Sequence, residues 1–377
     1  MAGTGTTPLS LTRKLLALNT INPPGRERES AQVLGKLLEE AGFRKEFYEF
    51  GSERTTLVAR LDGTGNKPSI LFTGHLDTVP LGGIAWKKDP FAGELDGDRL
   101  YGRGSSDMKS GVAAMVVMAL RLAKLRGLKA GITLVLTAGE ETACQGARYV
   151  VGLGNALPPS GAMVVGEPTG NHPLIGHKGC VRFIIKARGI TAHASTPTLG
   201  DNAIHKAADA IIKLRSFDFG LPPHPILGEP TLNIGTITGG MNINSVPDHA
   251  QLGIDIRTIP GQDEKDIRAR LQRALGADVT VEYLEGAHGL ETDPNDAWVC
   301  QVFDVMESFL KERPSPAGAT YFTDGSVLAP ACGNPPVVIL GPGEAPMAHK
   351  TDEYCSLKKL EEAVEAYTQI ALKWCTT

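Results

Sequence analysis

The sequence has no excess of positive charge, no long apolar run and no paired cysteines. Its 38 Lys and Arg against 42 Asp and Glu give a formal net charge of −4, which leaves no basic field for nucleic acid or for an anionic membrane surface. No run of about 18 or more apolar residues occurs, and the N-terminus lacks the apolar core of a signal peptide. We therefore expect a cytoplasmic protein that acts on a small molecule, with no nucleic-acid or membrane partner.

The six cysteines are scattered through the chain and contain no Cys-x-x-Cys pair. This spacing differs from that of zinc fingers and from the dense disulfide framework of small secreted domains. We expect reduced thiols that pack as small apolar side chains.

The length and the apolar pattern predict two domains. A chain of 377 residues is too long for one compact core of the commonest size. Short β-branched runs at 69–73, 132–137, 162–165 and 337–340 predict core strands, and the Ala- and Met-rich run 109–126 predicts a buried helix. Strands that alternate with helices indicate an α/β fold with a doubly wound, mostly parallel sheet.

The segment 179–291 has a different pattern, with alternating strands and two helical stretches. The predicted elements are strands at 181–187, 232–237, 251–256 and 279–283 and helices at 201–214 and 263–275. The order β-α-β-β-α-β is typical of a ferredoxin-like, two-layer α+β domain. We therefore predict a discontinuous catalytic domain of 1–178 and 292–377, and an inserted lid and dimerisation domain of 179–291.

Acidic and imidazole side chains follow three of the predicted core strands. His75 and Asp77 come after 69–73, Glu140 and Glu141 after 132–137, and Glu167 after 162–165. Each signal alone is ordinary, because such residues often form hydrogen-bonded turns or solvated helix starts. Open α/β sheets, however, hold their sites at these strand ends, and converging carboxylates repel one another unless a cation lies among them.

A further carboxylate, Asp107, precedes the predicted helix in the segment Gly-Arg-Gly-Ser-Ser-Asp. This segment lacks the third glycine of GxGxxG and the Gly-Lys-Ser/Thr of a P-loop, so we exclude nucleotide binding. Imidazoles and carboxylates without a thiolate suit Zn²⁺, Co²⁺ or Mn²⁺. Exposed or structural roles are expected for the other histidines: His172, His177, His205, His224, His249 and His288.

Five motifs together resemble the ordered motif set of the M20 metallopeptidase family, in the branch of the acetylornithine deacetylases, succinyl-diaminopimelate desuccinylases and carboxypeptidase G-type enzymes. They are GHLDTVP, YGRGSSDMKSG, TAGEE, VVGEPT and AHKTDE, and the match spans nearly the whole chain. The resemblance implies two divalent cations, zinc being favoured, bridged by Asp107. The other implied ligands are His75 and Glu167 for one cation and Glu141 and His349 for the second.

The resemblance also implies that Glu140 is the general base and that Asp77 supports His75. Physical reasoning agrees with these roles. A bridging carboxylate holds two metal ions about 3.5–4 Å apart, and Asp77 can accept the second N–H of the His75 imidazole. Glu140 lies beside the ligand Glu141, so we expect it to take a proton from water and pass it to the leaving nitrogen of an amide.

The predicted insert carries further matches to family positions. His193 resembles a lid histidine that reaches the partner subunit's site and stabilises an oxyanion, which implies a homodimer. Arg257 and Asn244 match substrate-binding positions, and Arg257 suits a substrate carboxylate. Thr323 matches a substrate-contacting loop, but residues 321–322 are Tyr-Phe where the family often has two glycines, which leaves the shape of the acyl pocket open.

The favoured function is hydrolysis of the amide bond of an N-acyl amino acid. The alternative is a metallo-dipeptidase or aminopeptidase, or a carboxypeptidase, acting on small peptides with the same metal ions. A metal-binding protein without catalysis is disfavoured because the candidate base Glu140 is present. The acyl group, the amine product and the native metal stay open, since one metal centre serves many substrates.

Overall fold

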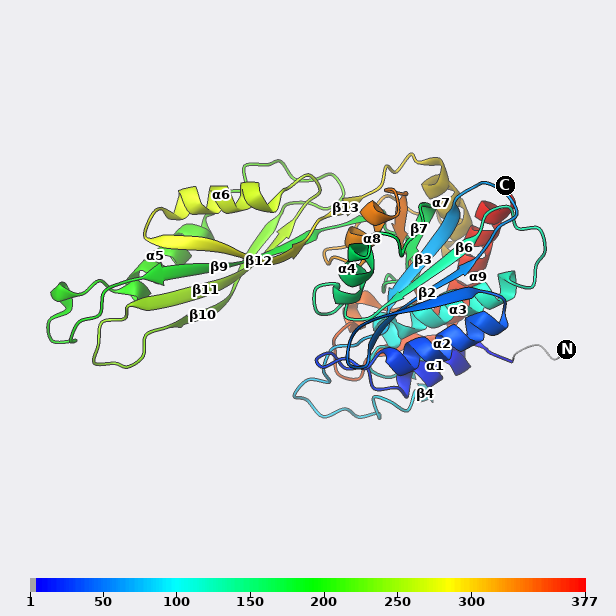
Figure 1. The fold of residues 1–377 in the computed structure, drawn as a ribbon, viewed down its shortest axis with the longest axis horizontal. Coiled ribbons are helices and arrows are strands. Elements are labelled where there is room, and N and C mark those ends of the chain that lie inside the picture. The colour runs from blue at the N-terminus through cyan, green and yellow to red at the C-terminus, as the bar shows by residue number, and fades with distance from the viewer. Residues whose placement is uncertain (1–4) are drawn as a thin grey trace. The chain divides into compact units, whose positions relative to one another are not determined.

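The computed structural model describes residues 5–377, which form two compact units (Figure 1). The first unit contains the chain up to Gly176 together with 291–317 and 323–377. The second unit contains 177–290 and the short segment 318–322. The second unit therefore consists of two segments of the chain, because the five residues 318–322 join its main segment.

A six-stranded sheet in the order β1-β2-β6-β3-β7-β14 forms the centre of the first unit. The strands are β1 (Arg44–Gly51), β2 (Arg54–Leu61), β3 (Ser69–His75), β6 (Ile132–Thr137), β7 (Ser160–Val165) and β14 (Val337–Ile339). The last four strands in the sheet order are parallel to one another, whereas β2 pairs antiparallel with β6 and with β1. The predicted mostly parallel sheet is confirmed, with an antiparallel hairpin added at one edge.

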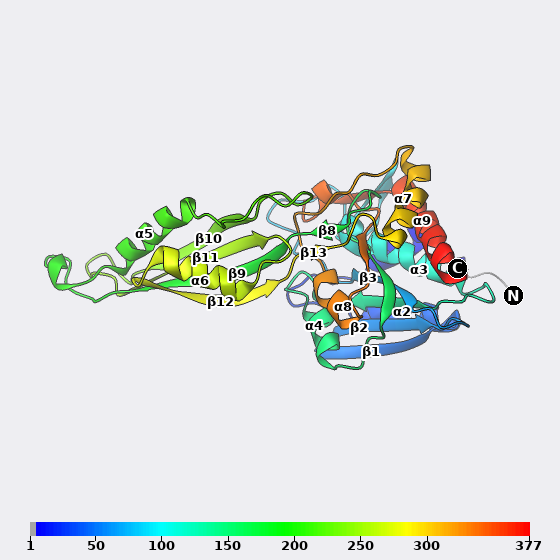
Figure 2. The ribbon, with the colours of Figure 1, turned by 90° about the horizontal axis from the view of Figure 1, so that it is seen from above.

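Helices cover this sheet because its central strands are apolar on both faces, and every residue of β6 is buried. The helices are α1 (Pro8–Leu16), α2 (Arg28–Glu40), α3 (Ser110–Leu122), α4 (Gln145–Gly152), α7 (Ala297–Leu310), α8 (Gly325–Ala331) and α9 (Leu357–Thr376). Helix α3 packs against α1, α2 and α9, and α4 packs against α8 (Figure 2). All of α3 except Arg121 is buried, as expected for a helix that is apolar on every side.

The second unit is a four-stranded antiparallel sheet with helices α5 (Ala203–Arg215) and α6 (Glu264–Leu275). Its strands, in sheet order, are β10 (Thr231–Gly239), β11 (His249–Thr258), β9 (Gly179–Arg188) and β12 (Val279–Ala287). Alternate residues of β9 and β11, among them Phe183 and Leu252, form a core with both helices. The chain order β-α-β-β-α-β is as predicted.

All six cysteines are free thiols, and only Cys300 is partly exposed. Among the residues that the structure describes, no helix is long and apolar enough to cross a membrane.

Candidate metal centre

The ends of three parallel strands bring the predicted acidic and imidazole residues to one edge of the central sheet. His75 is the last residue of β3, which pairs in parallel with both β6 and β7. Glu140 and Glu141 follow β6, and Glu167 follows β7. The carboxyl ends of parallel strands lie at the same edge, which is where open α/β sheets hold their sites.

Asp107 lies between two histidines, with one carboxylate oxygen near each. Its Oδ1 is 3.0 Å from Nε2 of His75, and its Oδ2 is 3.4 Å from Nε2 of His349. His75 Nε2 is also 3.8 Å from Oε1 of Glu167, and His349 Nε2 is 3.2 Å from Glu141. The five predicted metal ligands thus form one cluster in which a single carboxylate faces both imidazoles.

The carboxylates of the cluster bring more negative charge together than its two imidazoles can neutralise. Burial, and then the charge of Asp107, raises the pKa of Glu141 and raises that of Glu167 further. Hydrogen bonds to Asp107 and Glu141 raise the pKa of His349 to about 10. Although burial opposes the charged form, hydrogen bonds to Asp107 and Asp77 also raise the pKa of His75 well above its usual value. The same concentration of negative charge would stabilise divalent cations at this position.

The donor set fits such cations. His75, Asp107 and Glu141 each offer a ligand atom, and these atoms lie within 4.8 Å of one another. Imidazole nitrogens and carboxylate oxygens are ligands for zinc, cobalt and manganese. The Nδ1 of His75 lies 3.0 Å from the main-chain carbonyl oxygen of Asp77, to which it can only donate. That bond leaves Nε2 as the ligand atom, on the side of Asp107.

Asp77 contacts His75 through both its carbonyl oxygen and its carboxylate. Its carboxylate is 3.6 Å from Nδ1 of His75, whereas its carbonyl oxygen is 3.0 Å away. The carboxylate also accepts hydrogen bonds from Asn22 Nδ2 at 2.8 Å and from the main-chain N–H groups of Glu140 and Glu141 at 3.1 and 3.2 Å. This carboxylate therefore fixes the turn that carries the candidate base.

Glu140 lies on that turn and is 7% exposed. Burial, followed by the charge of Glu167, raises its pKa well above the ordinary value for glutamic acid. The side chain also lies near the buried groups of Cys144 and Asp324. The candidate base is therefore held by its main chain and surrounded by other ionisable side chains.

Glu353 was not predicted, yet it holds the loop that carries Asp107. Its Oε1 accepts from the main-chain N–H groups of Ser106 and Asp107 at 2.8 and 2.9 Å. Its Oε2 accepts from the N–H of Gly104 at 2.9 Å and from Arg103 Nη1 at 2.7 Å. Burial raises the pKa of Glu353 to about 7 although the main-chain hydrogen bonds oppose this change. The only sequence signal was its position at the end of AHKTDE.

Three of the predicted substrate-site residues lie in the second unit and are outside this cluster. His193 is exposed, and its Nδ1 lies 2.7 Å from Oγ of Ser195. The carbonyl oxygen of Asn244 accepts a hydrogen bond at 3.0 Å from the N–H of residue 194. Arg257 donates from Nε to Oδ1 of Asp255 at 2.8 Å. The guanidinium group therefore already has one carboxylate partner within its own strand.

Thr323 lies in the first unit and is fully buried. Its Oγ1 accepts a hydrogen bond from the N–H of Gly325 at 3.1 Å, so the hydroxyl group supports the start of α8. The two residues before it, Tyr321 and Phe322, belong to the second unit. The proposed contact between Thr323 and a substrate stays a prediction.

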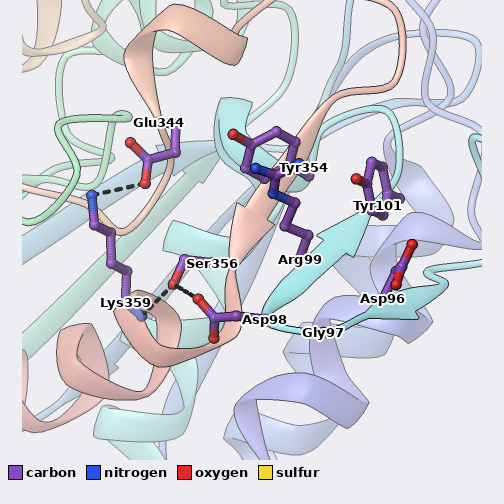
Figure 3. A pocket seen from close by; sticks show the side chains of 9 residues that line it. All are labelled: Asp96, Gly97, Asp98, Arg99, Tyr101, Glu344, Tyr354, Ser356 and Lys359. Atoms are coloured by element: carbon purple, nitrogen blue, oxygen red, sulfur yellow. Dashed lines mark hydrogen bonds and ion pairs between the residues drawn. The ribbon is translucent and has the colours of Figure 1, made fainter.

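A separate hollow of about 540 Å³ lies beside the small sheet of the first unit (Figure 3). This sheet consists of β4 (Leu95–Asp96), β5 (Arg99–Tyr101) and β15 (Tyr354–Ser356). Lys359 Nζ is 2.7 Å from Glu344, and the Arg99 guanidinium is 4.5 Å from the centre of the Tyr354 ring. None of the five clustered ligands lines this hollow, so it is distinct from the candidate metal centre.

Comparison with known proteins finds a matching family model and similar relatives for this chain. The model for peptidase family M20/M25/M40 matches residues 71–373. The acetylornithine deacetylase of Salmonella paratyphi B is 33% identical over 324 residues, which cover 81% of this chain and 80% of that protein.

Two solved structures have a similar fold. An M20 family metallo-carboxypeptidase from Sulfolobus solfataricus aligns with a TM-score of 0.81 at 18% identity, covering 98% of this chain and 99% of that chain. A dinuclear metal-binding peptidase of the M20 family from Bacillus subtilis aligns with a TM-score of 0.74 at 18% identity, covering 98% of each chain. At this identity, the two alignments establish the shared fold.

Proposed function

The chain belongs to peptidase family M20/M25/M40, and from this premise we propose that it is a dinuclear metal-dependent hydrolase that removes the acyl group from an N-acyl amino acid. The observation that carries this proposal is the position of Asp107, with one oxygen toward His75 and the other toward His349. The similarity to an acetylornithine deacetylase favours an N-acyl substrate over a free peptide.

In this proposal His75, Asp107 and Glu167 hold one cation, and Asp107, Glu141 and His349 hold the other. Zinc is the favoured metal, and cobalt and manganese are alternatives for the same donor set. Two bound cations supply polarisation of the scissile carbonyl and a lowered pKa of water. The distances within the cluster support this arrangement.

The protein's own residues then move and hold protons. Glu140 takes a proton from the attacking water and delivers it to the nitrogen of the leaving amine, so that the C–N bond breaks and an acid and an amine result. Asp77 holds the N–H groups of Glu140 and Glu141, which fixes the base relative to its neighbouring ligand. Glu353 fixes Asp107 through its main chain in the same manner.

The test combines metal analysis with hydrolysis of a substrate panel. Wild type, Glu140→Ala and the control Glu361→Ala, which changes an exposed residue of α9, are assayed on N-acetyl, N-succinyl and N-formyl amino acids and on unblocked dipeptides. We expect all three proteins to bind metal and Glu140→Ala alone to lose hydrolysis. Equal hydrolysis by Glu140→Ala would contradict the assignment of the base.

A second candidate function is hydrolysis of small peptides by the same centre. The fold similarity to a metallo-carboxypeptidase favours it, and Arg257 would suit the carboxylate of either substrate class. Activity on unblocked dipeptides but not on their N-acylated forms would select this function over deacylation.

We further propose a cytoplasmic homodimer formed through the second unit. Its edge strand β10 and the following loop expose Ile237, Met241 and Ile243, and Ile243 is fully exposed. Uncovered edge strands and apolar patches are uncommon on monomeric surfaces. In this dimer His193 stabilises the oxyanion, and Arg257, Asn244 and Thr323 contact the substrate. Sedimentation and the activity assay are run at the same protein concentration. A monomer with full activity would contradict the dimer.

A further inference from the structure

A second group of metal-ligating side chains lies beside the candidate base in the first unit. Glu140, Cys144 and Asp324 each offer a ligand atom, and these three atoms lie within 4.8 Å of one another. The side chains are buried, with 7%, 0% and 2% of their surfaces exposed. This trio has one sulfur and two carboxylate donors, whereas the main cluster has nitrogen and oxygen donors alone.

The local structure explains why these three groups meet. The N–H of Cys144 donates to the carbonyl oxygen of Glu140 at 3.0 Å, which closes one turn before α4. Asp324 directly precedes α8, and α4 packs against α8. Thr137, the last residue of β6, donates from Oγ1 to Oδ2 of Asp324. The strand end and the starts of the two helices therefore aim a thiol and two carboxyl groups into one space.

Asp324 supplies an independent sign that the space suits a cation. Its Oδ1 is buried and makes no hydrogen bond with a strong donor among the described residues, and the thiol of Cys144 interacts with the same carboxyl group. A buried polar atom without a partner is uncommon and costs about 1–3 kcal/mol. The neighbouring thiol of Cys144 is only a weak donor, so it satisfies this oxygen poorly, and a cation shared with Glu140 would satisfy it well.

We propose that Glu140, Cys144 and Asp324 form an inhibitory site for a thiophilic divalent cation, such as Cd²⁺ or zinc in excess of the main centre. On binding, the Cys144 thiol loses its proton to solvent and a metal–sulfur bond forms, without electron transfer. Sulfur selects soft cations, so Cd²⁺ is the sharpest probe. The cation would bind the carboxylate of Glu140, which could then no longer accept a proton from water. Inhibition therefore rests on the proposed function, whereas binding does not.

The experiment titrates Cd²⁺ into the full chain after the main centre has been loaded with zinc. Ultraviolet absorption of the cadmium–thiolate bond reports binding without turnover and does not respond to Cd²⁺ on nitrogen and oxygen ligands. The test variant is Cys144→Ser, and the matched control is Cys332→Ser, which changes another buried thiol. We expect wild type and control to show the same saturable band and the same inhibition, and Cys144→Ser to lose the band. Its inhibitory concentration of Cd²⁺ should rise roughly tenfold or more.

Asp324→Asn keeps the thiol and provides a second variant; it should weaken the band's apparent affinity by a similar factor of roughly ten. Absence of the band in wild type, or an unchanged band in Cys144→Ser, overturns the site. A band that depends on Cys144, combined with undiminished hydrolysis, overturns the inhibitory role. A protein that hydrolyses none of the panel fails the proposed function, yet its band still tests the site.

Discussion

The two units hold their candidate functional residues in opposite ways. In the first unit, Asp77 and Glu353 are buried, and each accepts three or more hydrogen bonds that fix a loop of the cluster. In the second unit, His193 is exposed and interacts with Ser195, two residues away. The first unit thus holds its candidate residues through buried hydrogen bonds to distant parts of the chain, whereas His193 in the second unit makes an exposed contact with a near neighbour.

Removal of metal is the change with the largest expected effect. Chelation should abolish hydrolysis because the cluster then lacks the cations that polarise the carbonyl, and added zinc should restore it. Circular dichroism before and after chelation is the control for folding, since the buried sheet and helices of the first unit do not depend on the cluster alone. Full activity in the chelated, metal-free protein would show that the organised cluster of the first unit is not a catalytic metal centre.

Substitution in the second unit should separate catalysis from metal binding. His193→Ala should lower kcat by about 10²–10³-fold if this side chain stabilises the oxyanion, while metal content stays at the wild-type value. His205→Ala, at an exposed position of α5, is the matched control and should retain activity. Loss of metal from His193→Ala would contradict a role for this side chain in catalysis alone.

His177 is the exception among the histidines of the second unit because it is fully buried. Burial lowers its pKa from 6.5 to about 4. The unfolded chain therefore binds the proton more tightly, and stability falls as the pH drops from 6.5 to about 4, by up to about 3 kcal/mol. Melting temperatures across this range should decline more for wild type than for His177→Gln. Parallel curves for the two proteins would show that this histidine is not buried in its neutral form.

The smallest effect is expected for Glu353→Gln, which keeps the shape of the side chain. An amide offers only one acceptor oxygen, so half of the hydrogen bonds to the Asp107 loop are lost. Metal affinity should fall about 10–100-fold, measured by competition with a chelator. Glu362→Gln on α9 is the control, because within residues 5–377 that side chain forms a long ion pair with Lys358 at 3.8 Å. Equal metal affinities of the two variants would show that the hydrogen bonds of Glu353 do not support metal binding.

The sequence indicated the central sheet and its site because both depend on local patterns. Short apolar runs such as 132–137 are strands that must be buried, and polar residues directly after them lie at one sheet edge. The helix predicted at 109–126 spans Ser110–Leu122, since its polar C-terminal residues contribute little to burial. These features follow from periodicity and need no knowledge of distant contacts.

Other features depend on contacts between residues that are far apart in the chain. Asn22 donates a hydrogen bond to Asp77, and Glu353 accepts hydrogen bonds from main-chain N–H groups 246 to 249 residues away. A main-chain donor is present at almost every residue, so it leaves no signal in the sequence. The segment 318–322 joins the second unit, yet five residues are too few to show a period.

The most direct test of the central claim is the metal content of wild type and of Asp107→Ala after dialysis, measured by elemental analysis. The shared position of Asp107 between His75 and His349 predicts about two divalent cations per wild-type chain and loss of both sites' tight binding in the variant. A wild-type protein without bound metal, or a variant that retains the full complement, would contradict a dinuclear centre bridged by Asp107.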